Sequence, residues 1–342
     1  MNDARHLPIA CRDGGLLPRR RIDDAAIEPR ARLRCRHHIH CAAAVLAIAA
    51  LPFAATDAAT PARGTLYLST LAGPLYRVGY VYDGAASLVL STPQQVASLP
   101  NGGGVRVGPD QSIYVVGQGH VHRVDPRAGT FVSANAGNNA NTVSFDPDGS
   151  RLWAGWKDTP LASVPIAPLS AGTTHLVSGD DAVATMVAFT PSHGAFYTTG
   201  GELENGNFGR IDMIGFVTQR TQTAAFATGV VYDSFSGHLI VAGVGRARQI
   251  APGNPAVVLS SREDSPAGDN YLVLQADGRG HLFGTRTGGS AQLVMIDYSA
   301  SGLIGAVDTV RLSVPIPSLV GLSGEAGVDR HAIFMDDFEA AP

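Results

Sequence analysis

The 342-residue sequence predicts an all-β protein, a β-propeller of six blades, and three observations lead to this fold class. First, a phrase of two apolar stretches joined by a polar turn recurs at an interval of about 43 residues, the length of a four-stranded blade. Second, 40 glycines and 21 prolines are too many for a helical bundle, and the body of the chain has no helical periodicity. Third, the first and last segments of the body complement each other as parts of one blade.

The first element in chain order is a leader over residues 1–58. Arginines at Arg30, Arg32, Arg34 and Arg36 precede an apolar core over 41–55, and small residues follow it. This pattern is typical of a secretory signal peptide, and the core is shorter than the about 20 residues that a membrane span needs. A buried alanine-rich helix is the alternative interpretation. The leader predicts a periplasmic or secreted protein without a membrane span.

The cysteines and the charges narrow the class of protein further. All three cysteines (Cys11, Cys35 and Cys41) lie in the leader, so we expect neither a disulfide nor a cysteine-based metal site in the body. A hydrophobic core must therefore hold the body together. The chain has 25 Lys and Arg against 29 Asp and Glu, a formal net charge of −4. It lacks the excess of positive charge that phosphate binding requires, so a basic nucleic-acid binder is excluded.

The repeated unit is predicted to be one blade of four strands. Its first two stretches alternate with a period of two, as strands that bury a face against a neighbouring blade do. Segments such as PDG and PSHG between them reverse the chain at low cost. A third and a fourth alternating stretch complete each unit. The second strands open at Ile113, Leu152, Phe196, Leu239 and Leu282.

The two ends of the body, residues 64–335, predict that the ring closes on itself. The segment from Gly64 matches the second, third and fourth strands of a blade and lacks a first strand. We expect SLVGLSG, from Ser318, to supply that first strand, which would remove the open sheet edges. HAIFM, just before the tail over 336–342, is then a surplus strand, so a ring of seven blades is the alternative.

The repeat resembles known propeller families. Its motif, apolar-Asp-Pro-x-Gly-x-apolar-Tyr/Trp, is present in FDPDGSRLW from Phe145 and is similar to that of the YVTN, NHL-like and SMP-30-like propellers, over residues 64–335. The resemblance implies the fold. SMP-30-like lactonases hold a metal ion with acidic and amide side chains near the channel mouth, so it also implies a possible enzyme. The segment IFMDDFE resembles the F-x-x-G-F-E tail of exported proteins of gram-negative bacteria, with Asp337 in place of glycine.

Candidate functional residues lie on what we call the top face of the ring. This face carries the loop that leads into the first strand of each blade and the loop between its second and third strands, and such loops commonly carry function. There we expect amides to hydrogen-bond a ligand, a tryptophan to stack on it, and acids to select a cation or a basic group. The six residues are Asn141, Trp156, Asp181, Glu202, Glu204 and Asn270.

Two classes of function are compatible with these residues. The first is a monomeric binding module for a small molecule, a glycan or a protein, and the second is a metal-dependent lactonase-like hydrolase or lyase. Residues equivalent to Asn141 in other blades include amides and hydroxyls but no carboxylate, whereas a divalent cation such as Ca²⁺ needs anionic oxygens. Asp181 or Glu204 would have to supply them. We therefore expect binding without a cofactor, with a divalent cation as the alternative.

Overall fold

The computed structural model describes residues 60–200, 206–222, 227–243, 245–263, 274–286, 292–316 and, as backbone, 331–336. The chain divides into two units, Met1–Phe53 and Ala54–Pro342, and every described residue belongs to the second. The predicted signal peptide lies outside the described residues. Within them every regular element is a strand, and no helix is long and apolar enough to cross a membrane.

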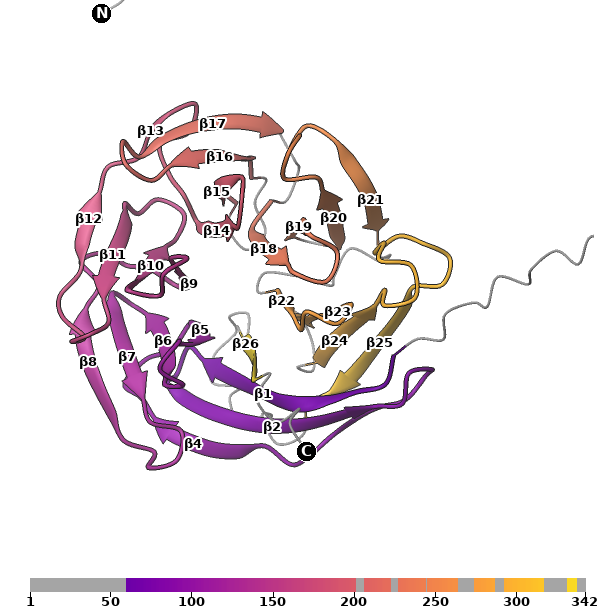
Figure 1. Cartoon of the computed structure of the whole chain (residues 1–342). Helices are drawn as coiled ribbons and strands as arrows, with labels where there is room; N and C mark the ends of the chain where they lie inside the picture. The colour runs from indigo at the N-terminus through magenta and orange to yellow at the C-terminus, as the bar shows by residue number, and fades with distance from the viewer. Residues whose placement is uncertain are drawn as a thin grey trace, which may run out of the picture. The chain divides into compact units, whose positions relative to one another are not determined.

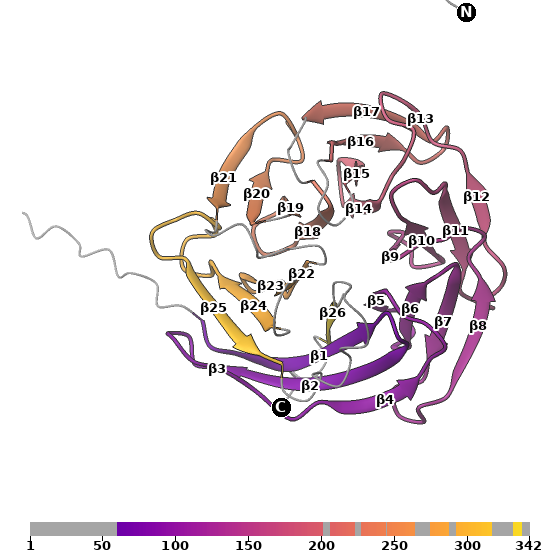
Figure 2. The ribbon, with the colours of Figure 1, turned by 180° about the vertical axis from the view of Figure 1, so that it is seen from behind.

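The strands form six sheets arranged as blades around a ring (Figures 1 and 2), so the predicted fold class is confirmed. Blade 1 consists of β5 (Gly104–Val107), β6 (Ile113–Gly117), β7 (His120–Val124) and β8 (Phe131–Asn135). Blade 2 consists of β9 (Thr142–Phe145), β10 (Arg151–Gly155), β11 (Leu161–Pro165) and β12 (Thr173–His175). Blade 3 consists of β14 (Met186–Thr190), β15 (Gly194–Thr198), β16 (Phe208–Asp212) and β17 (Val217–Gln222), with β13 (Ser178–Gly179) parallel to β17.

The remaining blades follow the same antiparallel order. Blade 4 consists of β18 (Gly229–Asp233), β19 (His238–Gly243), β20 (Arg246–Ile250) and β21 (Val258–Glu263). Blade 5 consists of β22 (Gln275–Ala276), β23 (His281–Arg286), β24 (Gln292–Asp297) and β25 (Val310–Pro315). Blade 6 consists of β26 (His331–Asp336), β1 (Ala62–Thr70), β2 (Pro74–Tyr82), β3 (Leu88–Leu90) and β4 (Gln94–Ser98).

Blade 6 closes the ring with strands from both ends of the body, as predicted. Its inner strand β26 pairs antiparallel with β1, with Thr70 opposite His331 and Thr65 opposite Asp336. The prediction was wrong about which segment closes the ring: HAIFMD does so, whereas the segment from Ser318 lies outside the described residues. No strand is then left over for a seventh blade among the residues described. The inner strands β5, β9, β14, β18, β22 and β26 contact one another in turn around the full circle.

The core lies between blades, which explains why the second strands are apolar on both faces. In β6, Val115 packs toward blade 6 while Tyr114 packs toward blade 2. The repeat alignment was wrong by one residue in blade 3. There Ala195 packs beside Trp153 of blade 2, and Phe196 packs toward blade 4. Ala195, not Phe196, is therefore equivalent to the residue that opens the second strand elsewhere.

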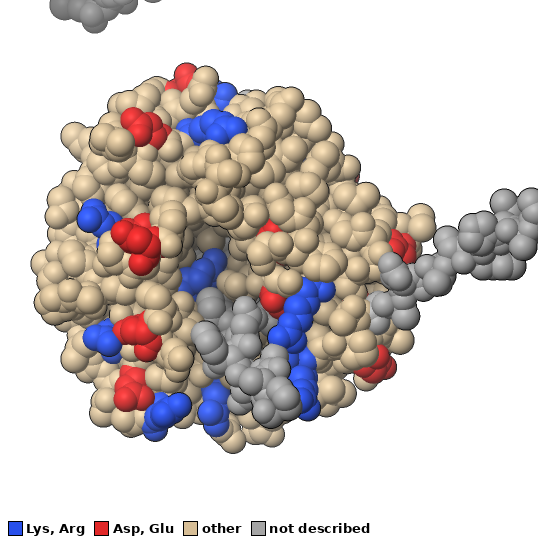
Figure 3. Space-filling view, in the orientation of Figure 1, with Lys and Arg blue, Asp and Glu red and all other residues tan. Residues whose placement is uncertain are grey.

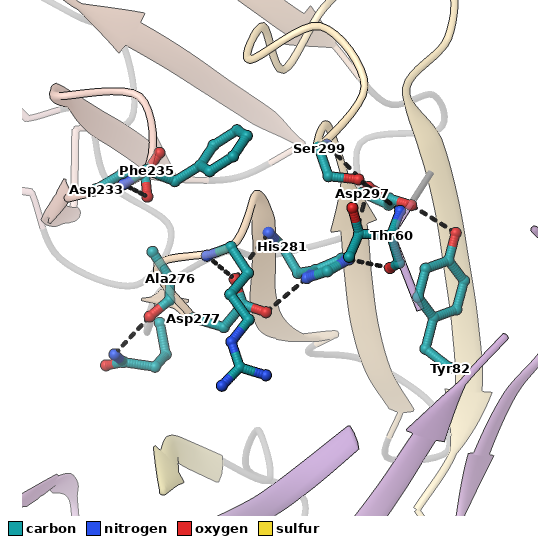
Figure 4. Close-up of polar contacts among 11 residues, drawn as sticks. Thr60, Tyr82, Asp233, Phe235, Ala276, Asp277, His281, Asp297 and Ser299 are labelled. Atoms are coloured by element: carbon teal, nitrogen blue, oxygen red, sulfur yellow. Dashed lines mark hydrogen bonds and ion pairs between the residues drawn. The ribbon is translucent and has the colours of Figure 1, made fainter. Parts of the chain in front are cut away.

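A buried polar network fastens blade 6 to blade 5 on the bottom face, the face opposite the top-face loops (Figure 4). The phenol of Tyr82, at the end of β2, donates to Asp297 Oδ2 at 2.6 Å. His281 Nδ1 donates to Asp277 Oδ2 at 2.5 Å, and its Nε2 donates to the carbonyl of Thr60 at 3.0 Å. Both partners of the imidazole are acceptors, so the network favours the doubly protonated, charged ring.

Candidate functional site

The structure describes three of the six predicted site residues. Asn141 lies just before β9 and Trp156 just after β10, in the top-face loops of blade 2, whereas Asp181 follows β13 in the segment that runs beside β17. Asn141 and Trp156 belong to neighbouring segments of blade 2, because the Asn141 N–H donates to the carbonyl of Gly155 at 3.1 Å. Glu202, Glu204 and Asn270 lie outside the described residues. Their predicted role in ligand binding stays a prediction.

Asp181 holds the outer part of blade 3 together. Its Oδ1 accepts hydrogen bonds from Arg220 Nη2 and Asn207 Nδ2, both at 2.7 Å, and its Oδ2 accepts one from the Tyr197 hydroxyl. Partial burial opposes ionisation, but the hydrogen bonds from Arg220, Tyr197 and Asn207 keep the pKa of Asp181 below its usual value. Because every oxygen of the carboxylate already has a partner, a ligand would have to compete with the blade for it.

The residues directly before the inner strands of blades 1 to 4 form what we call the channel rim, namely Gly103, Asn141, Thr185 and Thr228. Each rim carbonyl accepts a hydrogen bond from the preceding blade. For Asn141 the donor is the Gly104 N–H at 2.7 Å, and for Thr228 it is the Thr198 hydroxyl at 2.6 Å. The Ser69 and Thr142 hydroxyls donate to the carbonyls of Gly103 and Thr185. These bonds fix the rim positions relative to one another.

Glycines let the blades approach closely at the rim. A Cβ on Gly155 would lie 2.4 Å from the carbonyl oxygen of Ala184, and one on Gly102 would lie 2.2 Å from that of Thr70. Both distances are far below van der Waals contact, so only glycine fits at these positions. The backbone of one blade thus reaches the rim of the next without a side chain between them.

Three buried polar atoms at or beside the rim have no hydrogen-bond partner among the described residues. They are Asn141 Oδ1, Thr185 Oγ1 and Thr70 Oγ1. Leaving a buried polar group unpaired costs about 1–3 kcal/mol, so such atoms are uncommon and a hydrogen-bond partner would stabilise them. Asn141 Oδ1 accepts hydrogen bonds, and the two hydroxyls can donate or accept them. The rim is therefore suited to a polar group that carries N–H or O–H donors.

The loop that contains Trp156 is tied to the same blade. Asn138 Nδ2 donates to the carbonyl of Ala154 at 3.0 Å and to that of Pro160 at 2.7 Å. The Trp156 carbonyl accepts a hydrogen bond from the Thr159 hydroxyl at 3.1 Å, which closes the turn. Trp156 is half-buried, and this anchored loop keeps it on the top face, where the predicted stacking role places it.

Arg106, on the inner strand β5, is a channel residue that was not predicted from the sequence. Its Nη1 donates to the carbonyl of Val105 at 3.2 Å, and its Nη2 lies 3.5 Å from the carbonyl oxygen of Leu274, which belongs to the segment entering blade 5. Burial lowers the pKa of its guanidinium to about 10, so the group is charged at neutral pH. The signal was a lone charged residue in the apolar stretch GVRVG. Figure 3 shows a hollow at the centre of the ring, with both basic and acidic surface around it.

The described part of the chain offers no ligand set for a metal ion, although Asp277, His281 and Asp297 lie together in the buried network of the bottom face. The described rim positions carry one amide, two hydroxyls and one glycine, so the groups that they offer are neutral.

Comparison with known proteins assigns no family to this chain. No protein-family model matches the chain, and no curated protein matches it. TolB from Acinetobacter baumannii is similar with a TM-score of 0.49 and 16% identity, over 79% of this chain and 66% of that one. The calcium-binding protein regucalcin from Agrobacterium tumefaciens gives 0.41 and 13%, over 65% and 85%. The WD40 propeller domain of Doa1 gives 0.43 and 15%, over 61% and 67%.

Proposed function

We propose that this protein is an exported binding module that takes a ligand at the channel rim and the top-face loops around it. The observation that carries the proposal is the set of buried, unpaired atoms Asn141 Oδ1, Thr185 Oγ1 and Thr70 Oγ1. Asn141 and Thr185 belong to the rim, and Thr70 lies beside it. Inter-blade hydrogen bonds already hold the rim in place, so binding a ligand there costs little conformational entropy. The matching ligand presents hydroxyl or amide donors, as a glycan or a peptide backbone does.

The chemistry of the rim supports binding over catalysis. Amide and hydroxyl side chains do not titrate near neutral pH, whereas general acid–base catalysis needs a group with a pKa near the working pH. Asp181, the described acid among the predicted site residues, is held ionised by its hydrogen bonds within blade 3. Export rests on the basic flank and apolar core of the leader over 1–58, and on a body without cysteine.

A thermal-shift screen with named probes tests the proposal. We expect glucose, N-acetylglucosamine or trialanine to raise the melting temperature, because a ligand bound 100-fold above its Kd stabilises the native state by about 2.7 kcal/mol. The shift should disappear in Asn141→Leu, which has similar volume but no acceptor. Gln95→Met, at an exposed position of β4, is the matched control and should keep the shift. A shift that Asn141→Leu retains places the ligand elsewhere and contradicts the proposal.

The same assay separates the alternative of a metal-dependent lactonase-like hydrolase. That function requires a rise in melting temperature with CaCl₂ or ZnCl₂ that EDTA reverses, together with hydrolysis of a lactone. We expect neither, because the described rim groups are neutral and Arg106 places a positive charge on the same inner strand as Gly104, beside the rim. A reversible metal shift with lactone hydrolysis would replace the binding proposal with the enzyme.

A further inference from the structure

A groove lies between blades 6 and 1 on the bottom face of the ring, away from the channel rim. Its volume is about 740 Å³, within the range of about 300–1,000 Å³ that is common for ligand sites. One wall comes from β1 and β2, and the other comes from two turns of blade 1, over residues 108–112 and 125–130. These turns join the first strand to the second and the third to the fourth, so they lie on the bottom face.

Five charged side chains line this groove: Arg77, Asp110, Arg123, Asp125 and Arg127. The carboxylate of Asp110 already has partners within blade 1. Its Oδ2 pairs with Arg123 Nη2 at 2.6 Å and accepts a hydrogen bond from the Tyr114 hydroxyl at 3.1 Å. The carboxylate therefore neutralises Arg123 and leaves the other arginines unaffected.

The carboxylate of Asp125 accepts hydrogen bonds within its own turn. Its Oδ1 accepts hydrogen bonds from the backbone N–H groups of Arg127 at 2.8 Å and Ala128 at 3.1 Å. These two bonds hold the pKa of Asp125 below its usual value. The carboxylate thus shapes the turn at the lip of the groove.

Two arginines keep donors free for a ligand. Arg77 Nη2 donates to Gln94 Oε1 at 2.8 Å, which is a neutral partner. The Arg127 guanidinium makes no hydrogen bond or ion pair with the residues that the structure describes, although it interacts electrostatically with the nearby carboxylate of Asp125. Arg77 belongs to blade 6 and Arg127 to blade 1, so an arginine lies on each wall, and Asp125 is the acid beside Arg127. With three arginines against two acids, the groove is a local exception in a chain whose formal net charge is −4.

Apolar surface accompanies this charge. Phe131 and Val132, at the start of β8, line the groove with exposed fractions of 40% and 57%. The Phe131 ring packs edge-on against His122, with centroids 5.7 Å apart, and this contact holds one edge of the ring in place. An occupant that covers these side chains removes apolar area from water while its anionic groups meet the arginines.

We propose that this groove binds an acidic peptide segment of a partner protein, with carboxylates on Arg77 and Arg127 and an apolar side chain against Phe131 and Val132. A peptide fits better than a small anion because the two arginines belong to different blades and the apolar residues form an exposed lip. The site is independent of the channel rim, so either proposal can fail alone.

Fluorescence anisotropy with a fluorescein-labelled Glu-Glu-Phe-Glu-Glu peptide, at low ionic strength, tests this site. We expect saturable binding that weakens as salt is added. The double variant Arg77→Gln with Arg127→Gln should bind at least tenfold more weakly. Arg63→Gln with Arg279→Gln removes the same charge from exposed positions outside the groove and should bind as the unchanged protein does. If the double variant unfolds, Arg127→Gln alone replaces it, because that guanidinium has no hydrogen bond or ion pair to lose among the described residues.

Two further measurements test whether the groove needs carboxylates and whether it prefers them on a peptide. A peptide with glutamine in place of glutamate should not bind, and free glutarate should compete only at concentrations far above that of the peptide. Equal loss of binding in both double variants reveals a non-specific charge effect and overturns the proposal. Competition by glutarate at peptide concentrations also overturns it, in favour of a small dicarboxylate.

Discussion

Thr198 and Ser69 show how a single hydroxyl joins two blades at the channel rim. They lie at or near the ends of the second strands of blades 3 and 6, and each donates to the rim carbonyl of the following blade, Thr228 or Gly103. In blade 2 the residue equivalent to Thr198 is Gly155, and Thr142 supplies the hydroxyl to the next rim carbonyl instead. The same contact is thus made by different residues, and an alignment of the repeats by residue type does not reveal it.

We expect Thr198→Val to lower the free energy of unfolding by about 1–3 kcal/mol, because it leaves the buried carbonyl of Thr228 without its donor. Urea denaturation measures this loss. Thr174→Val, on an exposed position of β12, is the control and should stay within about 0.5 kcal/mol of the unchanged protein. Equal effects in the two variants would mean that the inter-blade bond adds nothing.

Thr185→Val, unlike Thr198→Val, should not lower the free energy of unfolding. Its Oγ1 is buried and unpaired among the described residues, so an isosteric methyl group removes a desolvated hydroxyl without breaking a bond. We expect the free energy of unfolding to stay the same or to rise by up to about 1 kcal/mol. A loss of more than about 1 kcal/mol in urea denaturation would show that the hydroxyl has a partner within the chain.

The stabilisation that His281 gives to the folded protein decreases as pH rises. Burial opposes its protonation, but the hydrogen bond to Asp277 and the charges of Asp277 and Asp297 raise its pKa above the usual value. A raised pKa in the folded state adds stability below the unfolded pKa of about 6.5 and loses it as pH rises through the folded pKa.

We therefore expect the difference in unfolding free energy between the unchanged protein and His281→Gln to shrink as pH rises above about 6.5. Urea titrations at each pH measure it, and the difference between the two proteins cancels the titration of the other groups. A difference that stays constant, or grows with pH, would mean that the imidazole is neutral in the folded protein.

At the scale of strands, the period of the sequence predicted the four-stranded blade but not every register. In blade 2, Phe145 pairs with Leu152, whereas in blade 3 Phe189 pairs with Ala195. The turn between these strands is therefore one residue shorter in blade 3. Since side chains alternate between the two faces of a strand, a one-residue difference moves Phe196 from one inter-blade core to the other.

The closing strand was equally hard to identify from sequence. Two apolar stretches follow β25, and either can satisfy the alternation of an inner strand. Only the pairing of β26 with β1, from Thr65 to Thr70, decides between them. The site was predictable in the same partial way: the loops that bear Asn141 and Trp156 followed from the topology. The hydrogen bonds that join Asp181 to Arg220, Tyr197 and Asn207 could not be predicted from the topology, because they depend on contacts between distant strands.

Removal of β26 tests its role as the closing element. A chain that ends at residue 330 leaves the β1 edge unpaired, and open edges pair with other chains. We expect a lower melting temperature, and oligomers in size-exclusion chromatography coupled to light scattering. A chain that ends at residue 336 keeps the strand and is the control. A monomer with the melting temperature of the control would exclude β26 as the closing strand.

At the scale of the whole molecule, the ring separates two surfaces with different chemistry. The rim and its top-face loops offer neutral amide and hydroxyl groups. The groove between blades 6 and 1 lies on the bottom face and offers Arg77 and Arg127 beside exposed apolar side chains. Because the inner strands contact one another all the way around, both surfaces have a common rigid support. Such an arrangement suits a module that holds a ligand on one face and a partner on the other.

A crystal structure of the purified protein at a resolution that shows ordered water tests the central claim most directly. The account predicts density for a bound polar molecule within hydrogen-bond distance, about 3 Å, of Asn141 Oδ1 and Thr185 Oγ1. Crystals grown with the probe that raises the melting temperature should show that probe at the same atoms. The account is contradicted if the chain's own side chains satisfy these atoms and the probe binds elsewhere.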